Sequence, residues 1–180
     1  MKKFSVIMAM DDKKWIGIKN ALAWNIPSDK HFFEEITTHN EDLSKMNWVI
    51  MWRRTWESIP SANRPLDNRI NCIVSKRVTV ESIDSKIDDF VLHFNNFEHA
   101  LEELSKKENV ENIYVIWWSS VYDIALVHPL LDKVYLTEVA WDYGCDRIVD
   151  FDKNNFVLEK YSDWQEENWH KFRFMVYKKV

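Results

Sequence analysis

Residues 22–29, with the sequence Leu-Ala-Trp-Asn-Ile-Pro-Ser-Asp, lead into a segment whose pattern predicts a helix over residues 28–38. Ser28 is the expected N-cap, because its hydroxyl can accept a hydrogen bond from the first turn of the helix. Asp29 comes next and heads one face of this helix. Three apolar residues share that face at spacings of i+3, i+4 and i+7: Phe32, Phe33 and Ile36.

The carboxylate of Asp29 has two interpretations. Acidic residues are common in the first turn of a helix, where the helix dipole stabilises their charge. Alternatively, Asp29 lies in an apolar pocket, which raises its pKa and allows it to manage protons near neutral pH. Spacing alone does not decide between these interpretations, and the rest of the chain is needed.

Length and composition predict one soluble domain over residues 1–180. The net charge is −5, which makes nucleic acids and anionic membranes poor partners, and no apolar run is long enough to span a membrane. Charged residues follow the apolar run at residues 4–10 at once, so we interpret that run as a buried strand and not a signal peptide. Cys72 and Cys145 are interpreted as free thiols of a cytoplasmic protein.

The order of apolar segments predicts an α/β fold. Strands and helices alternate in the first half of the chain, whereas the last third contains strands alone. We therefore expect a single domain with a mixed, mostly parallel, eight-stranded central sheet, about four flanking helices and an antiparallel C-terminal edge. The expected strands are residues 4–10, 47–51, 70–75, 89–94, 112–116, 133–140, 156–161 and 172–177, and the expected helices are residues 28–38, 53–59, a segment capped by Asn95, and 121–126.

Nine blocks of sequence, in this order and spacing, resemble the dihydrofolate reductase family along nearly the whole chain. The blocks are IMAM (7–10), IG (16–17), NALAWNIPSD (20–29), VIMWRRTWESIP (49–60), RPLDNRIN (64–71), YVI (114–116), VY (121–122), LTEV (136–139) and SDWQEE (162–167). The resemblance implies an NADPH-dependent reduction of 7,8-dihydrofolate to tetrahydrofolate. Hydride would pass to C6 of the pterin ring, and N5 would gain a proton.

The resemblance implies catalytic roles for three residues. Asp29 would accept hydrogen bonds from the pterin ring and help to supply the proton through water. Thr137 would orient Asp29 by a hydrogen bond, although by itself it reads as an ordinary strand threonine. Trp24 would shield the site and position a water molecule, although a lone tryptophan is more often part of a core.

The resemblance also assigns substrate-binding residues. Arg69 would pair with the α-carboxylate of the glutamate in the substrate, since a guanidinium offers two parallel donors to a carboxylate. Ile7, Phe33, Ile59 and Ile116 would wall the pterin and benzoyl rings, although such residues could equally form an ordinary core. The full expected set is Ile7, Met8, Ala9, Phe33, Ile59, Arg69, Ile116 and Tyr122.

Cofactor binding is implied for a larger set. Cationic residues fall where the family binds the 2′-phosphate of NADPH, and Thr55 stands at a helix start suited to pyrophosphate. Residues 16–22 would form a mobile loop over the nicotinamide. The full expected set is Ala9, Ile16, Gly17, Asn20, Ala21, Leu22, Trp52, Arg53, Arg54, Thr55, Ser75, Lys76, Arg77, Ile116, Trp117, Trp118, Ser119, Ser120, Val121 and Tyr122.

The chain departs from the family at several glycine positions. It contains 2 glycines and 10 tryptophans, whereas average usage of ~7% would give about 13 glycines. The family joins a Gly-Gly pair by a cis peptide where this chain has Trp117 and Trp118, and two indoles there would fill the pyrophosphate site. Seven tryptophans stand at positions where glycine is expected, with the least certainty at Trp48: Trp15, Trp48, Trp52, Trp117, Trp118, Trp141 and Trp169.

We hypothesise that these seven letters represent UGA codons that the organism reads as glycine. Some bacteria read UGA in this way, whereas other genetic codes read it as tryptophan. Restoring glycine would leave nine glycines and three tryptophans. The three that remain, Trp24, Trp56 and Trp164, all match family positions.

Two alternatives to an active reductase remain open. If the tryptophans are genuine, the chain would be a catalytically impaired protein of the same fold that binds folate or acts as a scaffold. A reductase for another pteridine or for a riboflavin precursor would share the fold, but Asp29 and Arg69 argue against it. No histidine spacing indicates a metal site, and we expect a free-standing monomer.

Overall fold

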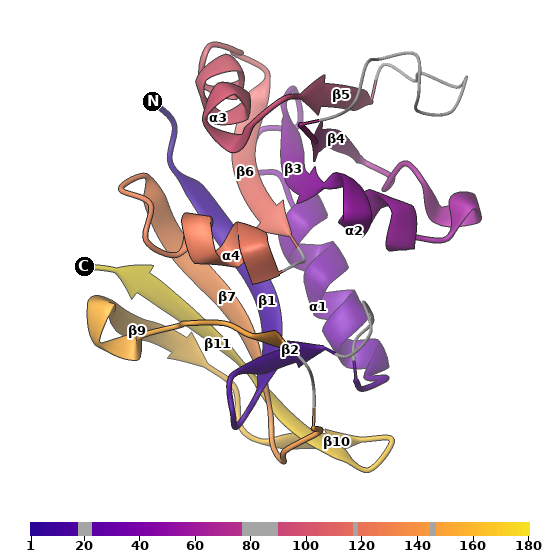
Figure 1. Ribbon diagram of the computed structural model, residues 1–180, viewed down its shortest axis with the longest axis vertical. Coiled ribbons are helices and arrows are strands. Elements are labelled where there is room, and N and C mark those ends of the chain that lie inside the picture. The colour runs from indigo at the N-terminus through magenta and orange to yellow at the C-terminus, as the bar shows by residue number, and fades with distance from the viewer. Residues whose placement is uncertain (18–22, 77–89, 117–118, 145–146) are drawn as a thin grey trace.

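A computed structural model describes residues 1–17, 23–76, 90–116, 119–144 and 147–180. Its main feature is a twisted nine-stranded sheet in the order β10-β11-β7-β1-β6-β3-β4-β5, with β9 paired to β11 (Figure 1). The strands of this sheet are β1 (Phe4–Asp11), β3 (Met46–Trp52), β4 (Arg69–Val74), β5 (Val91–Phe94), β6 (Val110–Ile116), β7 (Leu131–Val139), β9 (Phe156–Tyr161), β10 (Gln165–Glu167) and β11 (His170–Lys179). Two short strands, β2 (Trp15–Gly17) and β8 (Arg147–Ile148), form a separate pair.

The expected fold class is confirmed, with one strand more than the eight expected. Strands β7, β1, β6, β3, β4 and β5 are parallel, and β11 joins β7 in the antiparallel sense. The additional strand is β10, whose polar sequence carries no apolar pattern. In Figure 1, the C-terminal strands lie at one side of the sheet and β4 and β5 lie at the other.

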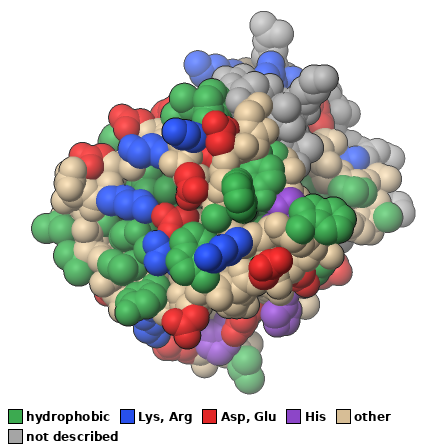
Figure 2. Space-filling model, turned by 90° about the horizontal axis from the view of Figure 1, so that it is seen from below, with side chains coloured by type: hydrophobic (Ala, Val, Ile, Leu, Met, Phe, Trp, Pro, Cys, Tyr) green, Lys and Arg blue, Asp and Glu red, His purple; other side chains and the backbone are tan. Residues whose placement is uncertain are grey.

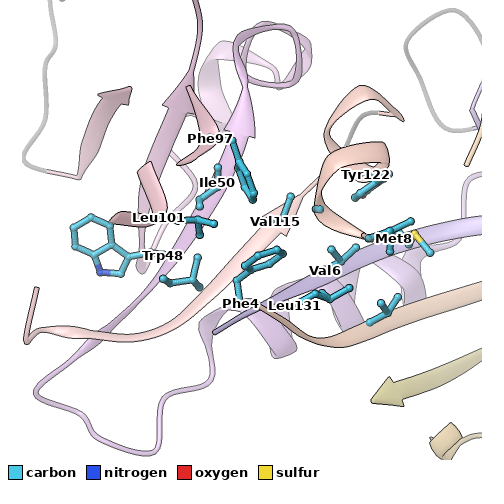
Figure 3. Close-up of a cluster of buried hydrophobic side chains, with 14 of the residues drawn as sticks. Phe4, Val6, Met8, Trp48, Ile50, Phe97, Leu101, Val115, Tyr122 and Leu131 are labelled. Atoms are coloured by element: carbon cyan, nitrogen blue, oxygen red, sulfur yellow. The ribbon is translucent and has the colours of Figure 1, made fainter. Parts of the chain in front are cut away.

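Helices cover both faces of the sheet. Helices α1 (Pro27–Thr38) and α2 (Arg53–Ser58) pack on one face, where Trp56 and Ile59 contact inward residues of β1, β3 and β6. Helices α3 (Phe97–Ser105) and α4 (Ser119–Ala125) pack on the other face, over the larger apolar cluster drawn in Figure 3. Residues of a strand alternate between the faces, so Val6 joins the second cluster and Ile7 joins the first.

Two helix caps differ from their expected residues by one or two positions. The N-cap of α1 is Ile26, so Ser28 lies inside the first turn and donates its backbone N–H to Glu167 Oε2 at 2.9 Å. The N-cap of α3 is Asn96, which accepts a hydrogen bond from the His99 backbone N–H, whereas Asn95 was expected. The β10–β11 hairpin thus supplies the capping carboxylate that α1 lacks in its own sequence.

The tip of that hairpin adopts a backbone conformation that favours glycine. Asn168 and Trp169 are its two central residues, with φ angles of 50° and 57°. Positive φ at both positions is the pattern of a type I′ turn, for which Asn-Gly is the preferred sequence. Trp141 also has a positive φ, of 91°. Both indoles are largely exposed, so no burial of the ring offsets the backbone strain.

The other described tryptophans at expected glycine positions lie at negative φ. Trp48 is buried, and its Nε1 has no hydrogen-bond partner in the described part of the chain. Trp52 is half-buried at the N-cap of α2, with its ring 6.3 Å from that of Phe97. Trp15 is half-buried in β2.

No helix among the described residues is both long and apolar enough to cross a bilayer. On the face of the molecule drawn in Figure 2, basic and acidic side chains are interspersed with apolar ones.

Candidate active site

A cavity of about 530 Å³ lies between α1, the segment after α2 and the end of β1. Its lining combines charged side chains from α1 and from the chain before β4 with apolar side chains from β1, α1 and the segment after α2. Seven residues expected at the site line it: Ile7, Met8, Ala9, Asp29, Phe33, Ile59 and Arg69. Eight further lining residues were not expected: Lys30, Glu34, Ser58, Pro60, Ala62, Asn63, Leu66 and Asp67.

Asp29 enters this cavity from the first turn of α1. The hydroxyl of Thr137 on β7 donates a hydrogen bond of 2.6 Å to Asp29 Oδ1, as the resemblance led us to expect. Thr137 is buried, and β7 pairs with β1, so the threonine is held by the centre of the sheet. The carboxylate is therefore fixed by a rigid element that is distant in sequence.

Burial raises the pKa of Asp29 above its ordinary value. The hydrogen bond from Thr137 and the charge of Lys30 act in the opposite direction, but desolvation prevails. A raised pKa favours the second interpretation of Asp29, in which it is an acid in an apolar pocket. Such a group keeps its proton to a higher pH than an exposed aspartate does.

Trp24 lies near the beginning of α1, where it is buried against Tyr143 with their ring centroids 5.5 Å apart. The indole Nε1 is buried, and the described residues offer it no hydrogen-bond acceptor. A buried donor without a partner costs free energy unless a water molecule or a ligand accepts its hydrogen bond. Trp24 is thus suited to hold such a group, although it does not line the cavity itself.

Ile116 and Tyr122, which were expected to bind the substrate, do not line the cavity. Ile116 ends β6, is fully buried, and pairs with Ile7 of β1. The buried hydroxyl of Tyr122 donates a hydrogen bond of 2.8 Å to the Ile7 carbonyl. Both residues therefore support the backbone of Ile7, which does line the cavity.

Arg69 also lines the cavity and is 5% exposed. Its Nε donates to the Asp67 carbonyl at 2.9 Å, and its Nη1 donates to the Thr37 hydroxyl at 2.7 Å. Its guanidinium carbon lies 5.5 Å from the centroid of the Phe33 ring. Burial lowers the pKa of Arg69, and the charges of Glu34 and Asp67 oppose this shift, but a guanidinium stays charged in proteins.

Several residues that are expected to bind a phosphate of the cofactor lie at the carboxyl edge of the sheet. Strands β3 and β4 are parallel and end side by side, with Trp52 paired to Val74. The residues that follow these ends are Arg53 and Arg54 on one strand and Ser75 and Lys76 on the other. Thr55 is buried in the first turn of α2. In open α/β sheets, ligands bind at this edge.

The remaining expected cofactor residues are only partly described. Ile16 and Gly17 belong to β2, which pairs with β8. Ser119, Ser120 and Val121 begin α4, and only their backbone is described. The following residues lie outside the described part of the chain: Asn20, Ala21, Leu22, Arg77, Trp117 and Trp118.

Thr37 is a functional candidate that the sequence did not indicate. It is fully buried near the end of α1 and accepts the hydrogen bond from Arg69 Nη1. A threonine in the last turn of a helix carries no signal of such a contact, since its partner lies 32 residues away.

The chain is similar to proteins of one family over nearly its whole length. The family model described as "Dihydrofolate reductase" matches residues 3–179. The dihydrofolate reductase of Heliothis virescens is 33% identical, over 99% of this chain and 98% of the relative. A putative dihydrofolate reductase of Caenorhabditis elegans is 35% identical, over 100% of this chain and 98% of the relative. The bifunctional dihydrofolate reductase-thymidylate synthase of Acanthamoeba polyphaga mimivirus is 33% identical, over 91% of this chain and 30% of that longer protein.

Proposed function

The chain belongs to the dihydrofolate reductase family, and from this premise we propose that it reduces 7,8-dihydrofolate to 5,6,7,8-tetrahydrofolate with NADPH. Two electrons and a proton would pass as hydride to C6 of the pterin ring, and N5 would gain a second proton. The observation that carries the proposal is one cavity lined by both Asp29 and Arg69. Dihydrofolate has a matching arrangement, with a hydrogen-bonding pterin ring and a carboxylate tail.

Asp29 is the residue that would bind the pterin ring. A carboxylate accepts two hydrogen bonds, and the ring offers an amino group and an adjacent N3–H as donors. The hydrogen bond from Thr137 leaves Asp29 Oδ2 and part of Oδ1 available for these donors. The apolar side chains of Ile7, Phe33 and Ile59 would then lie against the ring system.

Asp29 would also support the proton transfer. Its pKa is raised by burial, so that it can hold a proton at a pH where an exposed aspartate is ionised. The proton would reach N5 through water, and the indole N–H of Trp24, which has no acceptor among the described residues, is a donor that could hold such a molecule.

The residues at the carboxyl edge fit a dinucleotide that carries an extra phosphate. Arg53, Arg54, Ser75 and Lys76 would surround the 2′-phosphate, a cationic arrangement that favours NADPH over NADH. Arg53 contacts Glu57 at 3.4 Å, an exposed pair that a phosphate could compete with. When bound, the cofactor supplies the hydride.

A second function deserves a test because of Trp52. Its half-buried indole stands at the N-cap of α2, beside the expected phosphate-binding residues. If tryptophan is genuine there and at residues 117–118, the chain would bind folate without efficient turnover. The cavity with Asp29 and Arg69 would then be a binding site alone.

The decisive experiment compares two full-length proteins, one with tryptophan at the seven positions and one with glycine. NADPH binding is followed by quenching of tryptophan fluorescence, and turnover by the loss of NADPH absorbance when dihydrofolate is added. We expect the glycine protein to bind and turn over. If the glycine protein binds folate but never consumes NADPH, the proposed reaction is wrong. If the tryptophan protein also binds NADPH and turns over, the indoles do not block the cofactor site and the binding-protein alternative falls.

A further inference from the structure

Arg69 is held in place by protein groups before any ligand binds. It is almost fully buried, its Nε contacts the Asp67 carbonyl, and its Nη1 contacts the Thr37 hydroxyl. Asp67 precedes it by two residues, whereas Thr37 reaches it from α1. The described residues offer no hydrogen-bond acceptor to Nη2, and Arg69 lines the cavity. The two anchored donors therefore fix the plane of the guanidinium and leave other N–H groups for a ligand.

The Thr37 hydroxyl has a defined orientation. It donates a hydrogen bond of 2.7 Å to the Phe33 carbonyl one turn earlier in α1, so a lone pair is available for Arg69 Nη1. The two bonds form a chain that runs from Arg69 through Thr37 to the backbone of α1. Linked hydrogen bonds polarise each other. Because this site is buried, loss of the Thr37 hydroxyl would leave the Arg69 Nη1 donor unsatisfied.

We propose that Thr37 is a positioning residue that holds the Arg69 guanidinium in the plane needed to bind a carboxylate of the substrate. The assignment rests on the proposed function, since it presumes a substrate with a glutamate tail. A guanidinium binds a carboxylate best through two parallel hydrogen bonds, which require a fixed plane. Thr37 then acts on affinity for the tail and takes no part in the reaction of the pterin ring.

If Thr37 has this role, its substitution should affect two kinds of substrate differently. Dihydrofolate carries the glutamate carboxylate, whereas 6-methyl-7,8-dihydropterin has the same reacting ring without the tail. A residue that works through Arg69 changes the KM for the first and leaves the second unchanged. A residue that only stabilises the fold changes both alike, because both share the same folded enzyme.

The test uses the full-length enzyme with Thr37→Val, which keeps the side-chain volume and removes the hydroxyl. Thr37→Ser is the matched control, because it keeps the hydroxyl. We expect Thr37→Val to raise the KM for dihydrofolate about tenfold, the loss of roughly one charge-assisted hydrogen bond, with kcat and both constants for 6-methyl-7,8-dihydropterin unchanged. Thr37→Ser should keep the wild-type KM. Thr37→Ala serves the same purpose if Thr37→Val does not yield folded protein.

A second comparison shows whether Thr37 acts through Arg69. In an Arg69→Leu background, Thr37→Val should have no further effect on the KM for dihydrofolate. A persistent effect in that background, or an equal change for both substrates, would overturn the proposal. Binding of folate, measured by fluorescence quenching without turnover, gives the same comparison. A wild-type enzyme that binds folate and pterin with these differences but reduces neither would refute the proposed reaction and leave the role of Thr37 standing.

Discussion

Thr137 Oγ1 donates a 2.6 Å hydrogen bond to Asp29 Oδ1, which joins a central strand to the start of α1 across 108 residues of sequence. This bond stabilises the charged form of Asp29, whereas burial of the carboxyl group favours the neutral form. The balance between them sets the pH at which the site holds a proton.

Thr137→Val removes the donor and keeps the shape of the side chain. We expect the pKa of Asp29 to rise further, because only the opposing charge of Lys30 then remains against burial. Activity that needs a protonated site is lost as the pH rises through this pKa, so the midpoint of the decline should move to higher pH. The measurement is kcat/KM for dihydrofolate against pH. Thr137→Ser, which retains a hydroxyl, should follow the wild-type profile, and a downward shift in Thr137→Val would contradict our account.

Asp29→Asn should lower the activity and raise the stability of the protein. The pKa of Asp29 is higher in the folded chain than in the unfolded chain. The free energy of unfolding therefore falls as the pH rises from the unfolded-state pKa of about 3.9 through the folded-state pKa. At pH 7 the neutral amide should raise the free energy of unfolding by about 1 kcal/mol. The rate should fall by roughly 10² or more, since general acid-base assistance is lost.

Denaturant unfolding of the wild type and Asp29→Asn at several pH values checks this prediction. Below the unfolded pKa both states carry a neutral carboxyl group, so the gain in stability should vanish there. A gain that is the same at every pH would show that the ionisation of Asp29 is not its cause.

Trp169→Gly and Trp141→Gly should each stabilise the protein. A residue with a side chain costs about 1–2 kcal/mol of stability in the left-handed region, and glycine removes this cost. Glycine also destabilises by about 0.5–1 kcal/mol, because its unfolded chain has more conformational freedom to lose on folding. The expected gain in the free energy of unfolding is about 1 kcal/mol at each position. Trp164→Gly is the control, because Trp164 is an exposed tryptophan at negative φ whose ring lies 4.6 Å from the guanidinium of Arg173. This control should destabilise, and a loss of stability at residues 141 and 169 as well would contradict the strain argument.

The natural protein should carry glycine at all seven positions. The positive φ angles of Trp141 and Trp169 support this expectation, because glycine adopts such angles without strain. Mass spectrometry of protein purified from its own source should show the seven indoles replaced. Intact indoles in those peptides, or UGG codons at the seven sites in the gene, would end the hypothesis.

The central sheet was predictable because its strands are continuous apolar runs, such as β1 and β3, which are buried on both faces. The short strands β2, β8 and β10 were missed, since two or three residues give no period to detect. The N-cap of α3 was displaced by one position because Asn95 and Asn96 are equally good capping residues in sequence.

The candidate site was predictable where a residue type and a motif coincide, as at Asp29 and Arg69. Thr37 was not, because its role depends on a contact with a residue from another element. Glu167 was missed for the same reason, as its carboxylate caps a helix that begins 140 residues earlier. Long-range hydrogen bonds of this kind leave no local pattern in the chain.

The contact between Glu167 and the Ser28 backbone N–H also bears on the order in which the protein matures during synthesis. Helix α1 leaves the ribosome early, but the carboxylate that caps it and the β11 strand that borders β7 are among the last parts to be made. Chains are synthesised at about 5–20 residues per second. Glu167 is therefore made several seconds or more after the beginning of α1. A nascent chain stalled before β10 would hold Asp29 on an uncapped helix end, and we expect it to acquire substrate affinity only as the last strands emerge.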